Sequence, residues 1–238
     1  MTTLLLIRHG RTSANTAGIL AGRSPGVELD EVGHKQVAAV GERLAGVPLS
    51  ALITSPLRRC RQTAQAILTV RDGAQATVES GLTECGYGDW TGKPLRELAK
   101  DKLWSTVQQQ PSAVRFPNGE SMTEMAARAV GTVRGWDAKL TAEQGDHAVW
   151  AAVSHGDVIK AILADALGLH LDQFQRLMVD PASVSIIRYT PTRPYLVTMN
   201  STTTDLGALL APPPPAKKKR ARRSASDAPV GGGLGSAD

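Results

Sequence analysis

The chain has 238 residues, of which 42% are hydrophobic and 21% are charged. This composition is typical of a globular protein large enough to bury a complete core, and it argues against a fibrous or wholly disordered chain. The formal net charge is +5, but residues 211–238 carry +4 of it, so the rest of the chain is nearly neutral. A neutral body argues against a nucleic-acid-binding domain, because such domains depend on clustered basic residues.

Two cysteines, Cys60 and Cys85, form neither a disulfide framework nor a CxxC metal-binding pattern. The apolar run at residues 4–7 is too short for a membrane span or for the core of a signal peptide. We therefore expect a cytoplasmic protein without a membrane span.

Short apolar runs alternate along the chain with segments that carry apolar residues at helical spacing. Strands are predicted at residues 4–7, 51–54, 76–80, 149–153, 184–189 and 195–199. Helices are predicted at residues 31–44, 56–70, 94–109, 121–140 and 158–167. This order predicts an α/β fold built in layers around a sheet.

Two details refine the prediction. Ser55 and Pro56 fit an N-cap followed by proline at the first helical position, which places the start of the second helix at Pro56. Residues 16–30 and 82–92 are rich in polar residues and glycine, and we predict loops there; residues 82–92 are not expected to pack as an element.

Polar residues follow two of the predicted strands at the point where each strand ends. Arg8, His9 and Gly10 come after the first strand, and the fourth ends in Ser154-His155-Gly156-Asp157. In open α/β sheets, ligands bind at the carboxyl ends of parallel strands. An arginine offers a rigid donor fork for phosphate, and a histidine can serve as nucleophile or base.

The composition changes abruptly near the C-terminus. Four consecutive prolines at residues 212–215 precede the sequence KKKRARR and an end rich in glycine, serine and alanine. Such a segment cannot bury enough apolar surface to offset the cost of ordering, so we predict a disordered tail at 206–238. A solvated tail is the simplest interpretation, with contact to nucleic acid or an anionic surface as the alternative.

Five segments together resemble the histidine phosphatase superfamily, the group that includes cofactor-dependent phosphoglycerate mutases. They are RHGRT with Asn15 following, SPLRRCRQTA from Ser55, LTECGYGDWTG from Leu82, FPNGES from Phe116 and SHGDVIKAI from Ser154. The resemblance spans residues 3 to about 200 and is specific because all five motifs occur in the family's order. It implies a phosphoglycerate-mutase-like domain at 1–205, with a three-layer α/β/α sandwich around a mixed, mostly parallel sheet that has one antiparallel strand.

The resemblance also implies a role for each of five residues. His9 would be the nucleophile that becomes phosphorylated, and Glu84 would protonate the leaving oxygen. Arg8, Arg59 and His155 would hold the transferring phosphoryl group, and the family's Ser-x-Leu-x-Arg pattern selects Arg59 over its neighbour. Further substrate contacts are expected among Asn15, Gly22, Arg23 and Gly156, although a polar loop explains Asn15 and Arg23 equally well.

Elementary chemistry agrees with these roles. Phosphoryl transfer needs positioning and positive charge around the equatorial oxygens, which two guanidinium groups and a cationic His155 would supply. A neutral imidazole on His9 can attack phosphorus, and Glu84 can act first as acid and then as base toward water. No metal ligand set with recognisable spacing is present, so no metal is expected.

Three functions are compatible with this pattern. The leading hypothesis is a phosphomonoester hydrolase acting on a small phosphorylated metabolite. A phosphomutase is the alternative, and it alone would require 2,3-bisphosphoglycerate as cofactor; it would also need a longer basic cap than the compact residues 94–117. A catalytically silent phosphate-binding module is the third, and the presence of all five core residues disfavours it. Arg11 and the sequence VELDEVG depart from the family pattern and leave the substrate open, and no oligomeric state is predicted.

Overall fold

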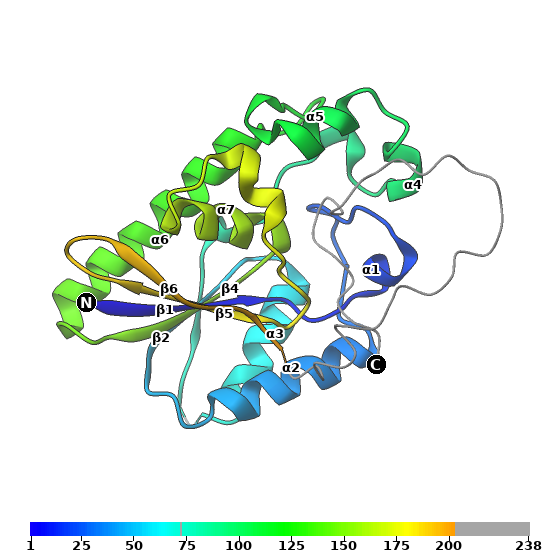
Figure 1. Ribbon diagram of the computed structural model, residues 1–238. Coiled ribbons are helices and arrows are strands. Elements are labelled where there is room, and N and C mark those ends of the chain that lie inside the picture. The colour runs from blue at the N-terminus through cyan, green and yellow to red at the C-terminus, as the bar shows by residue number, and fades with distance from the viewer. Residues whose placement is uncertain (72, 203–238) are drawn as a thin grey trace.

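The central feature of the computed structural model, which describes residues 1–71 and 73–202, is a six-stranded sheet with the order β3-β2-β4-β1-β5-β6 (Figure 1). Its strands are β1 (Thr2–Arg8), β2 (Leu49–Thr54), β3 (Ala76–Val78), β4 (Val149–Ser154), β5 (Val184–Tyr189) and β6 (Pro194–Ser201). β5 runs antiparallel to both of its neighbours, whereas the pairs β1–β4, β2–β4 and β2–β3 are parallel. The predicted mixed, mostly parallel sheet with one antiparallel strand is confirmed.

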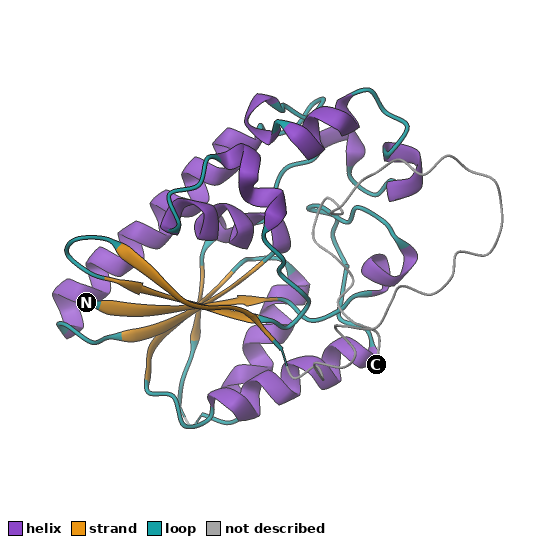
Figure 2. Ribbon diagram, viewed as in Figure 1, coloured by secondary structure: helices purple, strands orange, loops and turns teal. Residues whose placement is uncertain are grey.

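Helices cover both faces of this sheet, as Figure 2 shows. Successive strand residues point to opposite faces, and β1 divides accordingly. Leu4 and Leu6 lie in the core under α6 (Met122–Gln144) and α7 (Gly156–Ala166). Leu5 and Ile7 lie in the core under α2 (Glu31–Leu44) and α3 (Arg58–Leu68). The predicted three-layer α/β/α sandwich is therefore confirmed.

The start of α3 differs from the prediction. Leu57 occupies the N-cap position, its side chain makes no capping hydrogen bond, and the helix begins at Arg58. The Ser55 hydroxyl accepts a long hydrogen bond from the Leu57 amide at 3.4 Å, and it lies 2.7 Å from Nε2 of His155, a residue 100 positions away. A local Ser-Pro pattern cannot reveal such a distant partner, which is why the predicted cap was wrong.

Two further local predictions were wrong. The helix predicted at residues 94–109 is two helices, α4 (Leu95–Leu98) and α5 (Leu103–Gln109), because Asp101 turns the chain by accepting a hydrogen bond from the Leu103 amide at 2.8 Å. Residues 82–92 are packed, with the rings of Tyr87 and Trp90 buried in the core. Glycine makes this packing possible, because Gly88 has a positive φ of 52° and a side chain there would collide with the carbonyl of Pro117.

Short elements complete the described chain. They are α1 (Ser13–Ala17) and four 3₁₀ turns at Ser80–Leu82, Gly88–Trp90, Pro111–Ala113 and Leu171–Arg176. Among residues 1–71 and 73–202, no helix combines the length and apolar character needed to cross a bilayer. The predicted domain boundary at residue 205 and the tail predicted to be disordered at 206–238 lie outside the described residues.

Candidate active site

Two histidines leave the sheet side by side at the carboxyl ends of β1 and β4. The parallel register pairs Arg8 with Ser154, the last residues of the two strands, so His9 and His155 are the first residues after them. The His9 amide donates to the Ser154 carbonyl at 3.0 Å, and the two ring centroids lie 5.3 Å apart. Both rings are buried. The repeated strand-histidine-glycine pattern thus places two imidazoles at one point of the sheet edge.

Arg59 joins these two histidines from the first turn of α3. Its Nε donates to Nε2 of His9 at 3.2 Å, and its Nη2 donates to Nδ1 of His155 at 3.1 Å. The same Nη2 also donates to the Gly22 carbonyl at 2.8 Å. Nη1 is buried and has no acceptor among the described residues. A buried guanidinium nitrogen without an acceptor is a donor available to an anion.

These contacts determine the tautomer of each ring. A guanidinium can only donate, so the nitrogens it faces, Nε2 of His9 and Nδ1 of His155, carry lone pairs. Nδ1 of His9 lies 2.7 Å from the Gly10 carbonyl and therefore holds the proton. Nε2 of His155 lies 2.7 Å from the Ser55 hydroxyl and is the protonated nitrogen of that ring.

Both imidazoles are neutral in this arrangement. Burial lowers the pKa of His9 and that of His155 well below the usual value, and the charges of Arg59 and Arg8 lower both further. The cationic His155 expected from the sequence stays a prediction for the site with a phosphoryl group bound. A phosphoryl dianion among these groups would raise the pKa of His155, because an opposite charge favours the protonated ring.

Arg8 brings a second guanidinium to the site from the last position of β1. Its side chain is fully buried, and Nη1 donates to the Val179 carbonyl at 2.7 Å. Burial lowers the pKa of Arg8, while the carboxylates of Glu84, Asp180 and Asp157 raise it. An arginine keeps its charge even when buried, so the site holds two fixed positive charges.

Glu84 faces this cluster from the loop at residues 82–92. Its Oε2 lies 3.9 Å from Nδ1 of His155, and its Oε1 accepts from the Cys85 amide at 2.9 Å. Burial and then the charge of Asp157 raise the pKa of Glu84 to about 7, against the opposing influence of Arg59. A carboxyl with this pKa can carry a proton near neutral pH and also lose it, as an acid–base catalyst must.

An ionic cluster contacts the backbone of the loop that carries Glu84. Nε of Arg23 and Nη2 of Arg128 donate to the Glu84 carbonyl at 2.8 and 3.2 Å. Both guanidinium groups also pair with the Glu120 carboxylate, at 2.9 and 2.7 Å. Glu120 accepts in addition from the Gly86 amide at 3.0 Å. Arg23, predicted as a substrate contact, therefore supports the backbone that carries Glu84.

The other predicted substrate contacts lie at the margin of the cluster. Asn15 is the third residue of α1 and forms a capping box with the N-cap Thr12, because its Oδ1 accepts from the Thr12 amide at 3.0 Å and from the Thr12 hydroxyl at 2.8 Å. Gly22 offers its carbonyl to Arg59, and Gly156 is the first residue of α7. The structure thus brings together His9, Arg8, Arg59, Glu84 and His155, and contact of Asn15, Gly22, Arg23 or Gly156 with substrate stays a prediction.

Several residues of the site were missed in the sequence. Ser55 was interpreted as a helix cap, and Arg128, Tyr87 and Asp157 were not singled out. Tyr87 donates to Oδ2 of Asp157 at 2.7 Å, and both side chains are fully buried. Asp157 offered one signal, since it directly follows His155-Gly156 in the first turn of a helix that is otherwise largely apolar.

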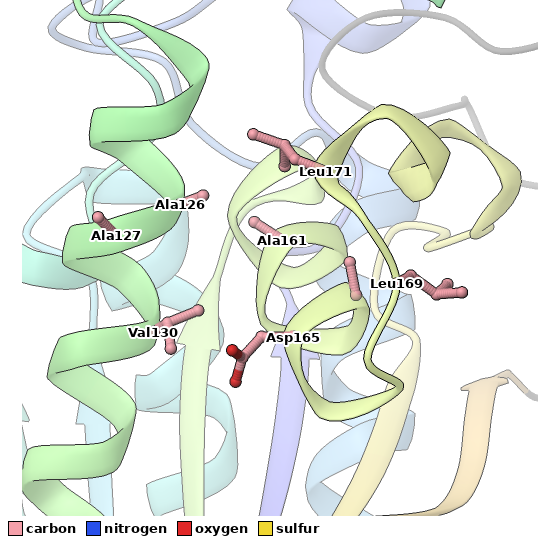
Figure 3. A pocket seen from close by; sticks show the side chains of 8 residues that line it. Ala126, Ala127, Val130, Ala161, Asp165, Leu169 and Leu171 are labelled. Atoms are coloured by element: carbon pink, nitrogen blue, oxygen red, sulfur yellow. The ribbon is translucent and has the colours of Figure 1, made fainter. Parts of the chain in front are cut away.

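A separate pocket lies between α6 and α7, and its lining differs from that of the cluster around His9. Figure 3 shows its apolar lining, which includes Ala126, Val130, Ala161 and Leu171. Among the described residues, Asp165 is the single charged residue of that lining, and it pairs with Arg134 at 2.8 Å. A lining whose described residues include no cation is unsuited to phosphate. In the part of the chain that the structure describes, no group of three or more His, Cys, Asp or Glu residues is arranged to hold a metal ion.

Comparison with known proteins decides the family. The model of the histidine phosphatase superfamily (branch 1) matches residues 4–202. This chain belongs to the histidine phosphatase superfamily. The match includes all five residues of the cluster.

Relatives of this chain carry different names. The bifunctional protein Rv2228c of Mycobacterium tuberculosis is 34% identical over 192 residues, which cover 79% of this chain and 50% of that protein. The chain thus spans about half the length of that relative. A protein of Erwinia tasmaniensis named probable phosphoglycerate mutase GpmB is 30% identical over 187 residues, covering 78% of this chain and 84% of that one.

A solved structure of a phosphatase has the same fold as this chain. Mycobacterial glucosyl-3-phosphoglycerate phosphatase Rv2419c superposes with a TM-score of 0.72 and 26% identity, over 84% of this chain and 99% of that one. The names of the proteins similar to this chain therefore include both a phosphatase and a probable phosphoglycerate mutase.

Proposed function

We propose that this chain is a phosphomonoester hydrolase that acts on a small phosphorylated metabolite through a phosphohistidine on His9. One observation carries the proposal: the lone pair on Nε2 of His9 points into a site that holds the buried guanidinium groups of Arg59 and Arg8. A neutral imidazole nitrogen next to two fixed positive charges suits attack on a phosphoryl group.

In the first step, Nε2 of His9 forms a bond to phosphorus as the bond to the ester oxygen breaks. The electron pair of the broken bond stays on that oxygen, which takes the proton of the Glu84 carboxyl and leaves as an alcohol. The proton on Nδ1 of His9 remains hydrogen-bonded to the Gly10 carbonyl, 2.7 Å away, and this bond disperses the positive charge that develops on the ring.

The phosphoryl oxygens are held by the surrounding donors. Nη1 of Arg59 is aimed at no acceptor among the described residues and is free to bind one oxygen. Arg8 supplies a second fixed charge, and His155 becomes a donor through Nδ1 once the phosphoryl dianion raises its pKa. Such preorganised donors are worth the most where charge develops in the transition state.

In the second step, water attacks phosphorus and the phosphorus–nitrogen bond breaks. The electron pair returns to Nε2 of His9, and the Glu84 carboxylate accepts the proton released by the water. Phosphate leaves, and both residues return to their starting states. A pKa of about 7 allows Glu84 to serve both steps.

The site and the relatives both favour an alkyl phosphoester as substrate. A catalyst that protonates the leaving oxygen is needed for alkyl esters, because alkoxides are strongly basic. The phosphatase Rv2419c bears the name of such an ester, glucosyl-3-phosphoglycerate. We also propose a cytoplasmic location, supported by Cys60 and Cys85, which are both free.

The test is phosphate release from a panel of phosphorylated sugars, glycerates and nucleotides, each with and without 2,3-bisphosphoglycerate. Net phosphate release independent of the bisphosphate is the expected result. Isomerisation that requires the bisphosphate and releases no phosphate would replace the hydrolase by the mutase. Binding without turnover by folded protein would indicate a silent binding module.

A further inference from the structure

One buried hydrogen bond joins the loop that carries Glu84 to the start of α7. The Tyr87 hydroxyl donates to Oδ2 of Asp157 at 2.7 Å, and neither side chain is exposed to solvent. Tyr87 lies three residues after Glu84, and Asp157 lies two residues after His155. The bond therefore ties the loop of the acid to the first turn of α7, whose N-cap is His155.

This connection fixes Glu84 relative to His155. The Glu84 carboxyl lies 3.9 Å from the His155 ring, and the two segments that set this distance are the ones that the hydrogen bond joins. The ionic cluster of Arg23, Arg128 and Glu120 holds the backbone of the same loop from its other side. Tyr87 and Asp157 hold the loop to the first turn of α7.

Asp157 also acts on Glu84 through its charge. Two carboxyl groups in a buried site repel when both are ionised, so the charge of one favours the protonated form of the other. Asp157 is one of the two largest reasons why the pKa of Glu84 is raised, burial being the first. Burial, Asp157 and Glu84 raise the pKa of Tyr87, so its hydroxyl keeps its proton and remains a donor.

Other groups face Glu84 from every neighbouring element. They are Arg8 on β1, Arg59 on α3, His155 and Lys160 on α7, Cys85 and Tyr87 on its own loop, and Arg23 and Arg128 at its backbone carbonyl. Arg59 and Arg8 favour an ionised Glu84 and oppose Asp157. Lys160 is buried, and its charge attracts both carboxylates.

We propose that Asp157 is a positioning residue for the acid Glu84: it fixes the Glu84 loop through Tyr87, and its negative charge favours the protonated Glu84 carboxyl that the leaving oxygen requires. This inference rests on the proposed function. It adds to that function a residue that does not touch the substrate but sets the pH range in which the first step works.

Two variants separate the charge of Asp157 from its hydrogen bond. Asp157→Asn removes the charge and keeps an oxygen that can accept from Tyr87, whereas Tyr87→Phe removes the hydrogen bond and keeps the charge. The measurement is the single-turnover rate of His9 phosphorylation by 3-phosphoglycerate as a function of pH, with p-nitrophenyl phosphate as a probe whose leaving group needs little protonation.

The wild-type rate with 3-phosphoglycerate should fall as pH rises through about 7, because Glu84 loses its proton there. In Asp157→Asn the pKa of Glu84 falls, so this decline should move to lower pH by about 1 unit. In Tyr87→Phe the decline should stay in place while the rate drops by about 3- to 10-fold. Asp165→Asn, on the same helix, serves as the matched control and should behave as wild type.

A decline in Asp157→Asn at the wild-type pH would overturn the inference and leave Asp157 with a purely structural role. If Asp157→Asn does not fold, Asp157→Ser removes the same charge with a smaller side chain and is judged by the same shift. Absence of phosphohistidine in the wild type with p-nitrophenyl phosphate and with every phosphoester of the panel would instead overturn the proposed function, so the two failures are distinguishable.

Discussion

The ends of β1 and β4 carry the same local pattern, yet they present opposite nitrogens to the site. His9 turns Nε2 toward Arg59, and its Nδ1–H donates a hydrogen bond to the carbonyl of Gly10, the next residue in the sequence. His155 turns Nδ1 toward Arg59 and Glu84, and its Nε2–H donates a hydrogen bond to Ser55, which follows the end of β2. Matching motifs therefore do not imply matching roles.

The difference supports the separate roles that the proposed mechanism gives to the two rings. On His9 the proton is held by a nearby backbone carbonyl, which leaves Nε2 as a nucleophile in fixed orientation. His155 lies 3.9 Å from Glu84, and under the proposed mechanism its Nδ1, which accepts from Arg59, becomes a donor to the phosphoryl group only after protonation. In that mechanism the first ring forms the covalent bond, and the second supports the transfer.

The largest expected effect comes from removing the nucleophile. His9→Ala should lose all measurable turnover while keeping its fold, because no neighbouring group can replace the attacking nitrogen. Phosphate release and the circular dichroism spectrum provide the measurement. His34→Ala, which removes an exposed histidine on α2, is the control and should retain activity. Turnover by folded His9→Ala would mean that the two rings had been assigned the wrong way round.

The next effect concerns the acid on the His155 side. Glu84→Gln keeps the size of the side chain and removes its proton, so phosphorylation by an alkyl ester such as 3-phosphoglycerate should slow by roughly 10²–10⁴-fold. The slowing should be much smaller with p-nitrophenyl phosphate, whose leaving group departs with little help. Single-turnover rates are required, because the same residue serves as base in the second step. Glu97→Gln, on the exposed surface of α4, is the matched control. Equal slowing with both esters would assign Glu84 to positioning and leave the acid unidentified.

Removing the second ring should have a smaller effect than removing the first. His155→Ala takes away one donor to the phosphoryl group, and the rate of phosphorylation should fall by roughly 10²–10³-fold. Labelled phosphate should still accumulate on His9, since the nucleophile and both arginines remain. If His155→Ala lost the labelled intermediate as completely as His9→Ala does, the distinction between the two rings would fail.

The smallest effect tests how the tautomer of His155 is maintained. Ser55→Ala removes the acceptor of the Nε2 proton, 2.7 Å away, and leaves the ring free to change its tautomer. We expect kcat/KM to fall by about 3- to 10-fold, the equivalent of a net hydrogen bond of about 1 kcal/mol. Ser105→Ala, at an exposed position of α5, should change nothing. A loss as large as that of His155→Ala would show that Ser55 has a more direct role.

Features encoded in local patterns were predictable from the sequence. The strand β1, the histidines at two strand ends and the layered α/β class can be read from short apolar runs and the polar residues directly after them. Arg59 and Glu84 came from the family resemblance, because nothing near an arginine on a helix or a carboxylate in a loop marks it as part of a site.

Features that depend on distant partners were not predictable. Ser55 fits a helix cap as well as it fits a partner of His155, and only the folded sheet brings the two together. Tyr87 and Asp157 lie 70 residues apart, so neither residue indicates the other in the sequence. Arg23 is a polar loop residue in the sequence, and its contact with the Glu84 carbonyl depends on the fold as a whole.

The most direct test is the chemical identity of the trapped intermediate. Wild-type protein is mixed with labelled phosphoester, quenched in alkali after a single turnover, digested and examined by mass spectrometry and ³¹P NMR. The account predicts an acid-labile, alkali-stable phosphohistidine at His9, with phosphorus on Nε2, the nitrogen that faces Arg59 at 3.2 Å. Phosphorus on Nδ1 of His9, or on any residue other than His9, would contradict it.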